Sequence, residues 1–410
     1  MRVALYYPWI YLTSGAERTL LRLTEYSRHD WTLFTNRFQP ATTFPEFAER
    51  RVVVLGEGVS VDRSVGATAR TCWKLVSQKL PLDGFDALLV VGEGVGDLVL
   101  LRNHQAPAVN LCLTPLRIAF DDVYRSHWME GAPLWKRAAV ALGCGIFRAV
   151  DRLAWSRYRR VFCISGEVRR RAVQGGLAKE NEMQLLFPGL GVEGFGEDVE
   201  YQPFFFIPGR IMWTKNIELG IQAFLEFVDS EPEFAAYRLV VGGIVDAKSQ
   251  PYLERLREMA GGDPRIEFRI HPSDAELASL YRTCRATLFT AFNEDYGIVP
   301  LEAMSFGKPV ISVNRGGPRE TLQHNVSGFL EEPNASSFAS RMAQLARSPD
   351  LTRSLGESGR RRARNYDWRV FAETIDKTIT EIVERIPKRP DSLTSFQQAV
   401  HVARQQLKRF

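Results

Sequence analysis

The feature that most constrains the fold is an alternation of strand-like and helix-like segments along the chain. Short segments rich in β-branched and aromatic residues, such as RVALYY, WTLFTN, RVVVL, DALLVV and AVNLCL, are separated by segments with helical periodicity. Strands that alternate with helices form parallel sheets, because each helix carries the chain back to the same edge. The pattern therefore predicts an α/β fold.

The alternation restarts at FFFIPGRI and continues through RLVVGG, IEFRI, ATLFTA, PVISV and SGFLEE. Two such arrays in series predict two doubly wound, Rossmann-like domains with parallel sheets, which suits a chain of 410 residues. We expect the first domain at 1–195, the second at 196–365, and C-terminal helices at 366–410 that pack back toward the first domain.

The composition argues against several classes of protein, namely disulfide-rich, zinc-binding, nucleic-acid-binding and membrane-spanning proteins. The five cysteines have no paired spacing of the kind found in zinc sites or disulfide frameworks, and the net charge of +5 gives little reason to expect nucleic acid as a partner. We see no signal peptide in MRVALYYPWIYLTSG and no apolar stretch of the roughly 20 residues that a membrane span needs. We expect a cytoplasmic protein that is at most peripheral on the inner face of a membrane.

The segment 135–160 is rich in Lys and Arg and also contains Trp135, Phe147, Trp155 and Tyr158. A basic amphipathic helix of this kind can contact a membrane surface. An ordinary packed helix with solvated arginines is the simpler interpretation. A second basic amphipathic segment is expected in the tail from Lys388.

The most informative stretch is FNEDYGIVPLEAM, which follows the predicted strand 286–290. Ligands of open α/β sheets bind where a strand enters the next helix. Pro300 suits the first turn of that helix, so the N–H groups of Tyr296, Gly297, Ile298 and Val299 are expected to face the cleft. Such a helix start favours a phosphate.

Two carboxylates in this stretch, Glu294 and Glu302, would repel a phosphate but accept hydrogen bonds from hydroxyl groups. Phosphate flanked by polyols describes a nucleotide sugar. In the simpler alternative, Glu302 supports the first helical turn and Glu294 is a solvated loop residue.

Further candidates follow other predicted strands. Arg210 and Lys215, after a strand that ends at Gly209, could neutralise a departing diphosphate. In the first half, Gly15 precedes a predicted helix, and Thr114 and Arg117 follow a strand.

Together these motifs resemble retaining glycosyltransferases of family four, which have the two-domain GT-B fold, and the mannosyltransferases among them in particular. The matching segments are NEDYGIVPLEAM, GKPVISVNRGGPRET and SGFL, with SGAER, LTPLR, CISGEVRRR, FPGLGVEGF, PGRIMWTKNIELGIQAF and YDW in support. The resemblance extends over about residues 1 to 385 and is most specific between 285 and 331.

The resemblance implies a role for each candidate. Glu294 would contact the transferred sugar and Glu302 the ribose, while Arg210 and Lys215 would bind the diphosphate. The remaining donor-binding residues would be Gly15, Gly209, Gly243, Ile270, Asp295, Tyr296, Gly297, Ile298 and Val299. The first domain would bind the acceptor, with Leu113, Thr114 and Arg117 in its pocket. No metal or other cofactor is expected.

Three positions depart from the family pattern. Leu113 stands where many relatives have a histidine that contacts the sugar, which leaves a deoxy sugar or a pentose open. Ser14 stands where the first loop usually has another glycine, and Ile270 replaces a glycine near the nucleobase.

We therefore expect a metal-independent transferase that moves mannose from GDP-mannose to a glycan, a lipid-linked saccharide or another hydroxyl acceptor. A transferase that uses a UDP- or dTDP-sugar is the alternative. A non-catalytic protein that binds nucleotide sugars is a third interpretation.

Overall fold

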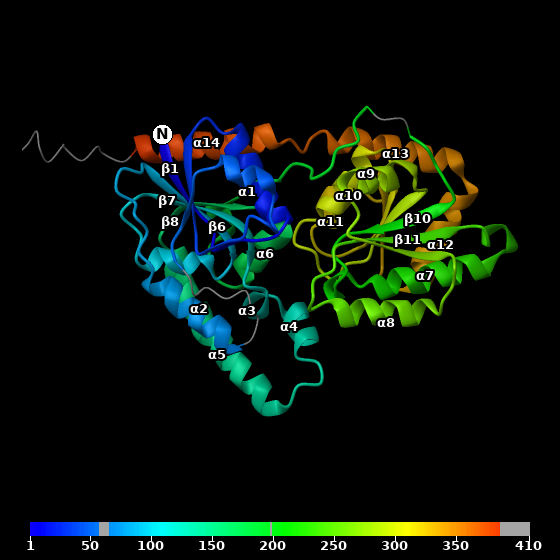
Figure 1. The fold of residues 1–410 in the computed structure, drawn as a ribbon, viewed down its shortest axis with the longest axis horizontal. Helices are drawn as coiled ribbons and strands as arrows, with labels where there is room; N and C mark the ends of the chain where they lie inside the picture. Colours follow the sequence, from blue (N-terminus) through cyan, green and yellow to red (C-terminus); the bar gives the residue numbers. More distant parts are fainter. Residues whose placement is uncertain (57–64, 197–198, 386–410) are drawn as a thin grey trace, which may run out of the picture.

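Each half of the chain forms one parallel β-sheet surrounded by helices, and the two halves lie side by side (Figure 1). The computed structural model describes residues 1–56, 65–196 and 199–385. The tail expected to be basic and amphipathic, from Lys388, lies outside the described residues.

The first sheet has seven strands in the order β5-β3-β1-β6-β7-β8-β9. Their bounds are β1 (Arg2–Tyr6), β3 (Asp30–Thr35), β5 (Val52–Val54), β6 (Ala87–Gly94), β7 (Ala108–Pro115), β8 (Tyr158–Cys163) and β9 (Met183–Leu185). A separate pair is formed by β2 (Trp9–Ile10) and β4 (Arg37–Phe38). The central strands are apolar almost throughout because helices cover both faces of the sheet.

Alternate residues of β1 show which helices cover which face. Val3 and Leu5 share a core with Leu20 of α1 (Gly15–Tyr26), whereas Ala4 and Tyr6 belong to a second core. The first face also carries α6 (Gly166–Gln174). The opposite face carries α2 (Val65–Ser77), the 3₁₀ helix η2 (Gly96–Leu101) and α5 (Leu134–Trp155).

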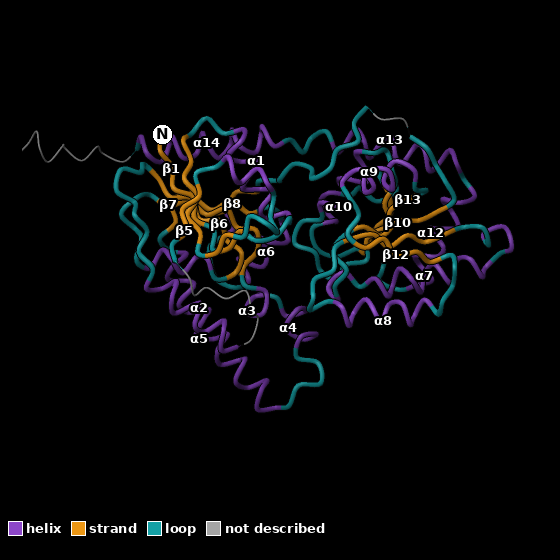
Figure 2. The backbone as a smooth tube through the Cα atoms, in the orientation of Figure 1, coloured by secondary structure: helices purple, strands orange, loops and turns teal. Residues whose placement is uncertain are grey.

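The second sheet has six strands in the order β12-β11-β10-β13-β14-β15 (Figure 2). Their bounds are β10 (Phe204–Pro208), β11 (Arg238–Gly243), β12 (Ile266–Ile270), β13 (Ala286–Phe289), β14 (Val310–Val313) and β15 (Gly328–Glu331). The helices are α7 (Ile217–Ser230), α8 (Gln250–Ala260), α9 (Asp274–Thr283), α10 (Ile298–Ser305), α11 (Pro318–Thr321), α12 (Ala335–Arg347) and α13 (Pro349–Ala363).

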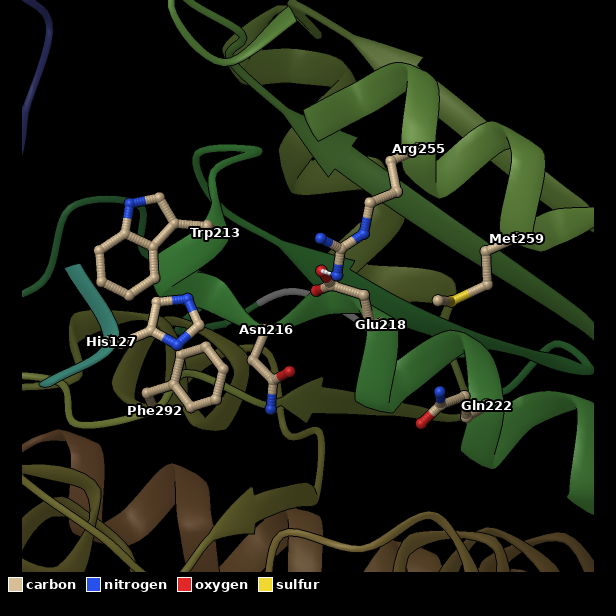
Figure 3. Close-up of a pocket in the computed structure, with 8 residues that line it drawn as sticks. All are labelled: His127, Trp213, Asn216, Glu218, Gln222, Arg255, Met259 and Phe292. Atoms are coloured by element: carbon tan, nitrogen blue, oxygen red, sulfur yellow. Dashed lines mark hydrogen bonds and ion pairs between the residues drawn. The ribbon is translucent and has the colours of Figure 1, made fainter. Parts of the chain in front are cut away.

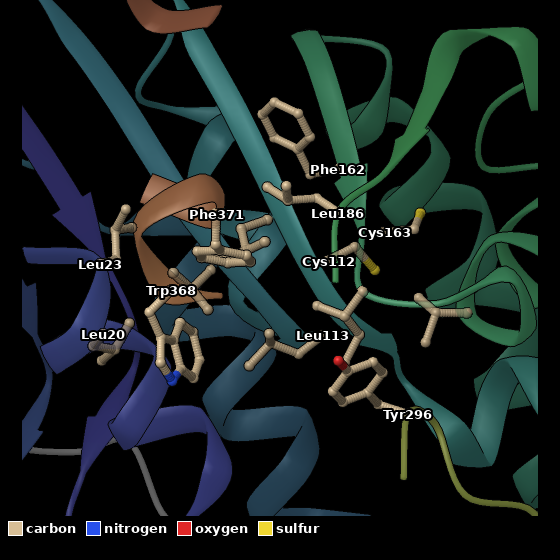
Figure 4. Packing of buried hydrophobic residues seen from close by; sticks show 14 of the residues in the cluster. Leu20, Leu23, Cys112, Leu113, Phe162, Cys163, Leu186, Tyr296, Trp368 and Phe371 are labelled. Atoms are coloured by element: carbon tan, nitrogen blue, oxygen red, sulfur yellow. The ribbon is translucent and has the colours of Figure 1, made fainter. Parts of the chain in front are cut away.

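The last described helix, α14 (Trp368–Glu384), returns to the first sheet and packs against α1. Trp368 donates its indole N–H to the carbonyl of Leu190 at 2.8 Å, and Asp376 accepts from the backbone N–H of Arg28 at 2.8 Å. Figure 4 shows Trp368 and Phe371 of α14 beside Leu20 and Leu23 of α1. The C-terminal helix α14, which follows the second half in the sequence, thus packs on the first half.

Two short elements connect the first sheet to the junction between the halves, namely α3 (Arg117–Phe120) and α4 (Asp122–Trp128). Asp121 caps α4 by accepting from the backbone N–H of Tyr124 at 3.0 Å. On the other side of the junction, the 3₁₀ helix η4 (Trp213–Lys215) follows β10. These elements bring polar side chains of both halves together.

Candidate active site

The loop between β13 and α10 is held by side chains of the first half. Arg117 donates through Nη2 to the carbonyl of Asn293 at 2.9 Å, and Ser165 Oγ donates to the carbonyl of Asp295. Arg171 forms an ion pair with the Asp295 carboxylate. Burial alone would lower the pKa of Arg117, but the carboxylates of Asp295 and Asp121 raise it above its usual value. The loop that carries Glu294 is therefore fixed at the junction of the two sheets.

Glycines allow this loop to turn sharply. Gly297 adopts a left-handed conformation with φ of 87° and precedes α10, where no side chain caps the helix start. Gly317 donates its N–H to the carbonyl of Glu294 at 2.9 Å, and a Cβ on Gly317 would lie 2.2 Å from the carbonyl oxygen of Tyr296. A larger residue at 317 would push the loop away, so this glycine is needed by the packing.

Glu294 and Lys215 meet near the junction of the two halves. The Lys215 Nζ lies 2.5 Å from Oε2 of Glu294, and their side chains are 22% and 27% exposed. Lys215 reaches this position because its carbonyl accepts from Thr290 Oγ1 at 2.8 Å, while Asn216 turns the chain in a left-handed conformation. The structure thus places one predicted sugar-binding group next to one predicted phosphate-binding group.

Arg210 lies on the loop after β10, but its partner is a carboxylate of the neighbouring loop. Its Nη2 is 2.9 Å from Oδ2 of Asp246. Burial acts to raise the pKa of Asp246, whereas hydrogen bonds from Ser249 and the charge of Arg210 lower it below the usual value. Arg210 is 33% exposed, so it remains accessible to a ligand.

Two predicted glycines, Gly209 and Gly243, make a close backbone contact beneath Arg210. A Cβ on Gly243 would lie 1.7 Å from the carbonyl oxygen of Gly209, which itself has φ of 128°. Ile270 pairs with Gly243 at the end of β12, and it is half-buried. The backbone packing of the sheet therefore determines the positions of Gly209, Gly243 and Ile270.

Glu302 is buried, with 8% of its surface exposed, and both of its carboxylate oxygens have partners. Oε2 accepts from the Tyr281 hydroxyl at 2.9 Å, and Oε1 accepts from the backbone N–H of Val192 at 3.2 Å. Burial raises the pKa of Glu302, while the bond from Tyr281 and the charge of Arg18 act in the opposite direction. Its expected contact with a ribose stays a prediction, and its observed contacts are with the protein.

The side chains of Asp295 and Tyr296, two predicted donor-binding residues, contact the protein in this structure. Asp295 binds Arg171, and the Tyr296 hydroxyl donates to the carbonyl of Pro188 at 2.5 Å. Figure 4 shows Tyr296 next to Leu113 in the apolar core. Both side chains anchor the loop to the first half, because Arg171 and Pro188 belong to that half. The predicted phosphate contact involves the backbone N–H groups of residues 296–299, and it stays a prediction.

The candidates of the first half are also partly engaged. Thr114 Oγ1 accepts from Nη1 of Arg171 at 2.9 Å, and Leu113 is buried. Gly15 begins α1, and a Cβ there would meet nothing within 4 Å. Packing therefore leaves open space at Gly15, whereas Leu113 offers no polar group to a sugar.

Sequence reasoning missed two residues of the junction, Arg171 and Glu320. Arg171 is 2% exposed and contacts Thr114, Asp121 and Asp295. Glu320 accepts from the backbone N–H groups of Gly166 and Glu167, at 2.6 and 3.0 Å, and so caps α6 from the other half of the chain. The motifs CISGEVRRR and NRGGPRET contain both residues, but their pairing depends on the tertiary arrangement.

A hollow of about 250 Å³ lies at the junction (Figure 3). The His127 ring stacks on Trp213 with centroids 4.4 Å apart, and Phe292 completes the aromatic side. Its lining residues are His127, Trp213, Asn216, Glu218, Gln222, Arg255, Met259 and Phe292. None of the predicted donor-binding residues lines it.

Across residues 1–56, 65–196 and 199–385, no group of three or more His, Cys, Asp or Glu side chains could hold a metal ion.

Residues 196–362 match the family model described as glycosyl transferases group 1. The human alpha-1,3/1,6-mannosyltransferase ALG2 is 29% identical over 218 residues, which cover 48% of this chain and 52% of that protein. The D-inositol 3-phosphate glycosyltransferase of Thermobispora bispora is 33% identical over 183 residues, or 43% of each chain. The chain spans about half the length of the curated relatives it matches.

Solved structures of other proteins share this fold over most of the chain. Sucrose-phosphate synthase from Thermosynechococcus elongatus superposes with a TM-score of 0.73 at 17% identity, covering 93% of this chain and 99% of that one. HepE from Anabaena, in complex with UDP and glucose, gives 0.66 at 16% identity, with coverage of 93% and 99%. At these identities the likeness shows the fold, which is the GT-B fold expected from the sequence.

Proposed function

We infer that this chain, whose residues 196–362 match the glycosyl transferases group 1 and which has the GT-B fold, transfers a sugar from a nucleotide donor to a hydroxyl acceptor. The observation that carries the proposal is the contact between Lys215 and Glu294 near the junction of the two halves. Transfer needs a group that holds the sugar and a cation at the leaving phosphate, and this pair places the two side by side.

In the proposed reaction, the acceptor oxygen bonds to the anomeric carbon while the bond from that carbon to the diphosphate oxygen breaks. The acceptor proton passes to the departing diphosphate on the same face, so the configuration at the anomeric carbon is retained. Lys215 and Arg210 stabilise the charge that develops on the diphosphate. Glu294 accepts hydrogen bonds from the sugar and orients it, and no metal or cofactor takes part.

We propose mannose from GDP-mannose as the donor. The support is the similarity of this chain to mannosyltransferases, which include the mouse ALG2 protein at 32% identity over 178 residues. The acceptor would be a glycan, a lipid-linked saccharide or another hydroxyl compound. We also propose a cytoplasmic location. Contact with a membrane through the segment 135–160 is a separate proposal, which does not depend on the identity of the donor.

A UDP- or dTDP-sugar is the second candidate donor. Leu113 favours it, because this buried side chain gives no hydrogen bond to a sugar hydroxyl at the position where the resemblance implies a histidine. A deoxy sugar would not need that bond.

Thermal unfolding with a panel of donors tests the proposal. A ligand that binds the folded state raises the melting temperature with the logarithm of its saturation. We expect GDP-mannose to raise it, and UDP-glucose and dTDP-rhamnose to leave it unchanged. Stabilisation by either of the latter alone would reassign the donor. No shift with any nucleotide sugar would contradict the proposed activity.

A protein that only binds the nucleotide sugar would give the same thermal shift. Incubation of the stabilising donor with an extract of lipid-linked and free saccharides separates the two possibilities, because a transferase releases the free nucleotide. Binding without release of the nucleotide would support the non-catalytic interpretation.

A further inference from the structure

One face of α5 is apolar and exposed. Trp135, Leu142, Ile146 and Leu153 are 74%, 69%, 60% and 55% exposed. They are seven, four and seven residues apart, so at about 3.6 residues per turn they form one line along the helix. We call these four residues the α5 stripe.

The stripe is not needed for packing within the domain. The opposite face of α5 is buried through Val140, Cys144, Asp151, Ala154 and Trp155. A monomeric protein rarely leaves such a continuous apolar line in water unless another surface covers it.

The structure also corrects which aromatic residues of the segment 135–160 could contact a membrane. Trp155 is buried, and the Tyr158 hydroxyl donates to Asp97 at 2.5 Å inside the domain. Phe147 packs against Phe120 with ring centroids 6.2 Å apart. Of the four aromatic residues in the basic segment, Trp135 alone is exposed, and the aliphatic residues of the stripe take the place of the others.

The charge around the stripe is positive. The helix carries Lys136, Arg137, Arg148 and Arg152, whereas its single carboxylate, Asp151, is buried. The three arginines donate to backbone carbonyls, those of Ala132, Ala119 and Gly175. At about 100° per residue, Lys136 and Arg152 flank the stripe on its two sides, whereas Arg137 and Arg148 lie on the opposite face, where Arg148 packs over the Phe120 ring. Within the described ranges, Lys136 and Arg152 form no ion pair, so their charge is available to an anionic surface.

These features fit an anionic lipid bilayer better than a second copy of this chain. A helix that lies in the membrane interface buries an apolar line and keeps cations at the level of the headgroups. A symmetric pair of α5 stripes would bring cations of the two copies together, which is unfavourable. None of the described helices is long and apolar enough to cross a bilayer, so the expected contact is interfacial.

We propose that the α5 stripe docks this protein on an anionic membrane surface. Figure 1 shows α5 projecting from the first domain, with α4 between it and the second domain. Because His127 of α4 stacks on Trp213, the projecting end of α5 is connected to the junction of the two domains. If the proposed transferase activity holds, this arrangement presents the cleft to an acceptor anchored in lipid; docking itself does not depend on that activity.

Vesicle flotation tests the proposal with the full chain. We expect the protein to float with vesicles of phosphatidylcholine and phosphatidylglycerol at low salt, and to remain at the bottom with phosphatidylcholine alone. The double variant Leu142→Glu/Ile146→Glu should lose at least tenfold in the bound fraction, because it puts two carboxylates on the stripe. Both side chains are exposed, so the thermal unfolding curve should be unchanged.

Val370→Glu is the matched control, since Val370 is 59% exposed on α14 and lies outside the stripe. It should float like the unchanged protein. No flotation with anionic vesicles at low salt would overturn the proposal. Flotation of the double variant equal to that of the unchanged protein would also overturn it. A dimer in solution that Leu142→Glu/Ile146→Glu converts to a monomer would overturn it too, because the stripe would then bind a second copy. Loss of flotation leaves the thermal shift with nucleotide sugars intact, so the two proposals fail separately.

Discussion

Arg171 of α6 and Asp295 of the loop before α10 form an ion pair across the junction of the two domains. Arg171 is buried, and it also contacts Thr114 at 2.9 Å and Asp121 at 3.2 Å. Because Asp295 directly follows Glu294, the first domain helps to set the position of a group proposed to hold the sugar.

Replacing Arg171 with methionine should destabilise the protein strongly. The change keeps most of the volume but removes the ion-pair partner of Asp295, while Asp121 keeps its pair with Arg117 at 2.9 Å. Removal of one member of a buried ion pair costs about 3–5 kcal/mol. Urea unfolding should show this loss in the free energy of unfolding. Arg170→Met is the control, because Arg170 is 53% exposed and its pair with Glu167 contributes less than about 1 kcal/mol. Equal losses in both variants would contradict a special role for Arg171.

The general fold could be predicted because its signal is local. Strand-like segments such as FFFIPGRI and RLVVGG show their identity through composition, and the order of alternation fixes parallel sheets. The same holds for the loop that ends at Gly297, whose glycine and following Pro300 mark a helix start.

The partners across the junction could not be predicted, because they depend on how two domains meet. Nothing near Glu302 in the sequence indicates that Tyr281 and the backbone of Val192 satisfy its carboxylate. Likewise, CISGEVRRR contains several arginines, and only the fold selects Arg171 for burial. The exposed side of α5 could not be predicted for the same reason, since both faces of this helix carry apolar residues and only the packing shows which of them are buried.

Alanine at Lys215 should slow sugar transfer by about 10²–10³-fold, because the charge on the leaving diphosphate loses a cation. Glu294→Ala should abolish transfer by removing the group that orients the sugar. Their ion pair is partly exposed, so either change should alter the free energy of unfolding by less than about 1 kcal/mol. The measurement is the rate of nucleotide release with the donor that raises the melting temperature. Lys79→Ala, on the exposed surface of the first domain, is the control, and wild-type rates in either cleft variant would refute the assignment.

Two variants separate the possible roles of Glu302. Glu302→Gln should reduce the stabilisation that the donor provides, if the carboxylate binds ribose hydroxyls as well as Tyr281. Tyr281→Phe should instead lower the free energy of unfolding by about 1–3 kcal/mol, because it leaves a buried oxygen of Glu302 with one donor fewer. Melting temperatures measured with and without the nucleotide-sugar donor report both effects. An unchanged donor shift in Glu302→Gln would restrict this residue to holding the segment that links the domains.

Asp97 should make the stability of the first domain depend on pH. Its carboxylate is buried, and burial raises its pKa from 3.8 to about 6, although Tyr158 and Asn110 donate hydrogen bonds to it at 2.5 and 3.0 Å. A carboxyl whose pKa is higher in the folded state binds its proton more tightly there. Stability is therefore lost as the pH rises from about 4 to 6, by on the order of 3 kcal/mol, and stays lower above that range. Asp97→Asn keeps an acceptor for both bonds and cannot ionise. Urea unfolding at pH 4.5 and 7.5 measures the free energy of unfolding of both proteins. Relative to the unchanged protein, the variant should be more stable at pH 7.5 than at pH 4.5. Asp83→Asn, an exposed carboxyl in the same domain, should show no such gain, and parallel pH profiles for Asp97→Asn and the unchanged protein would refute the prediction.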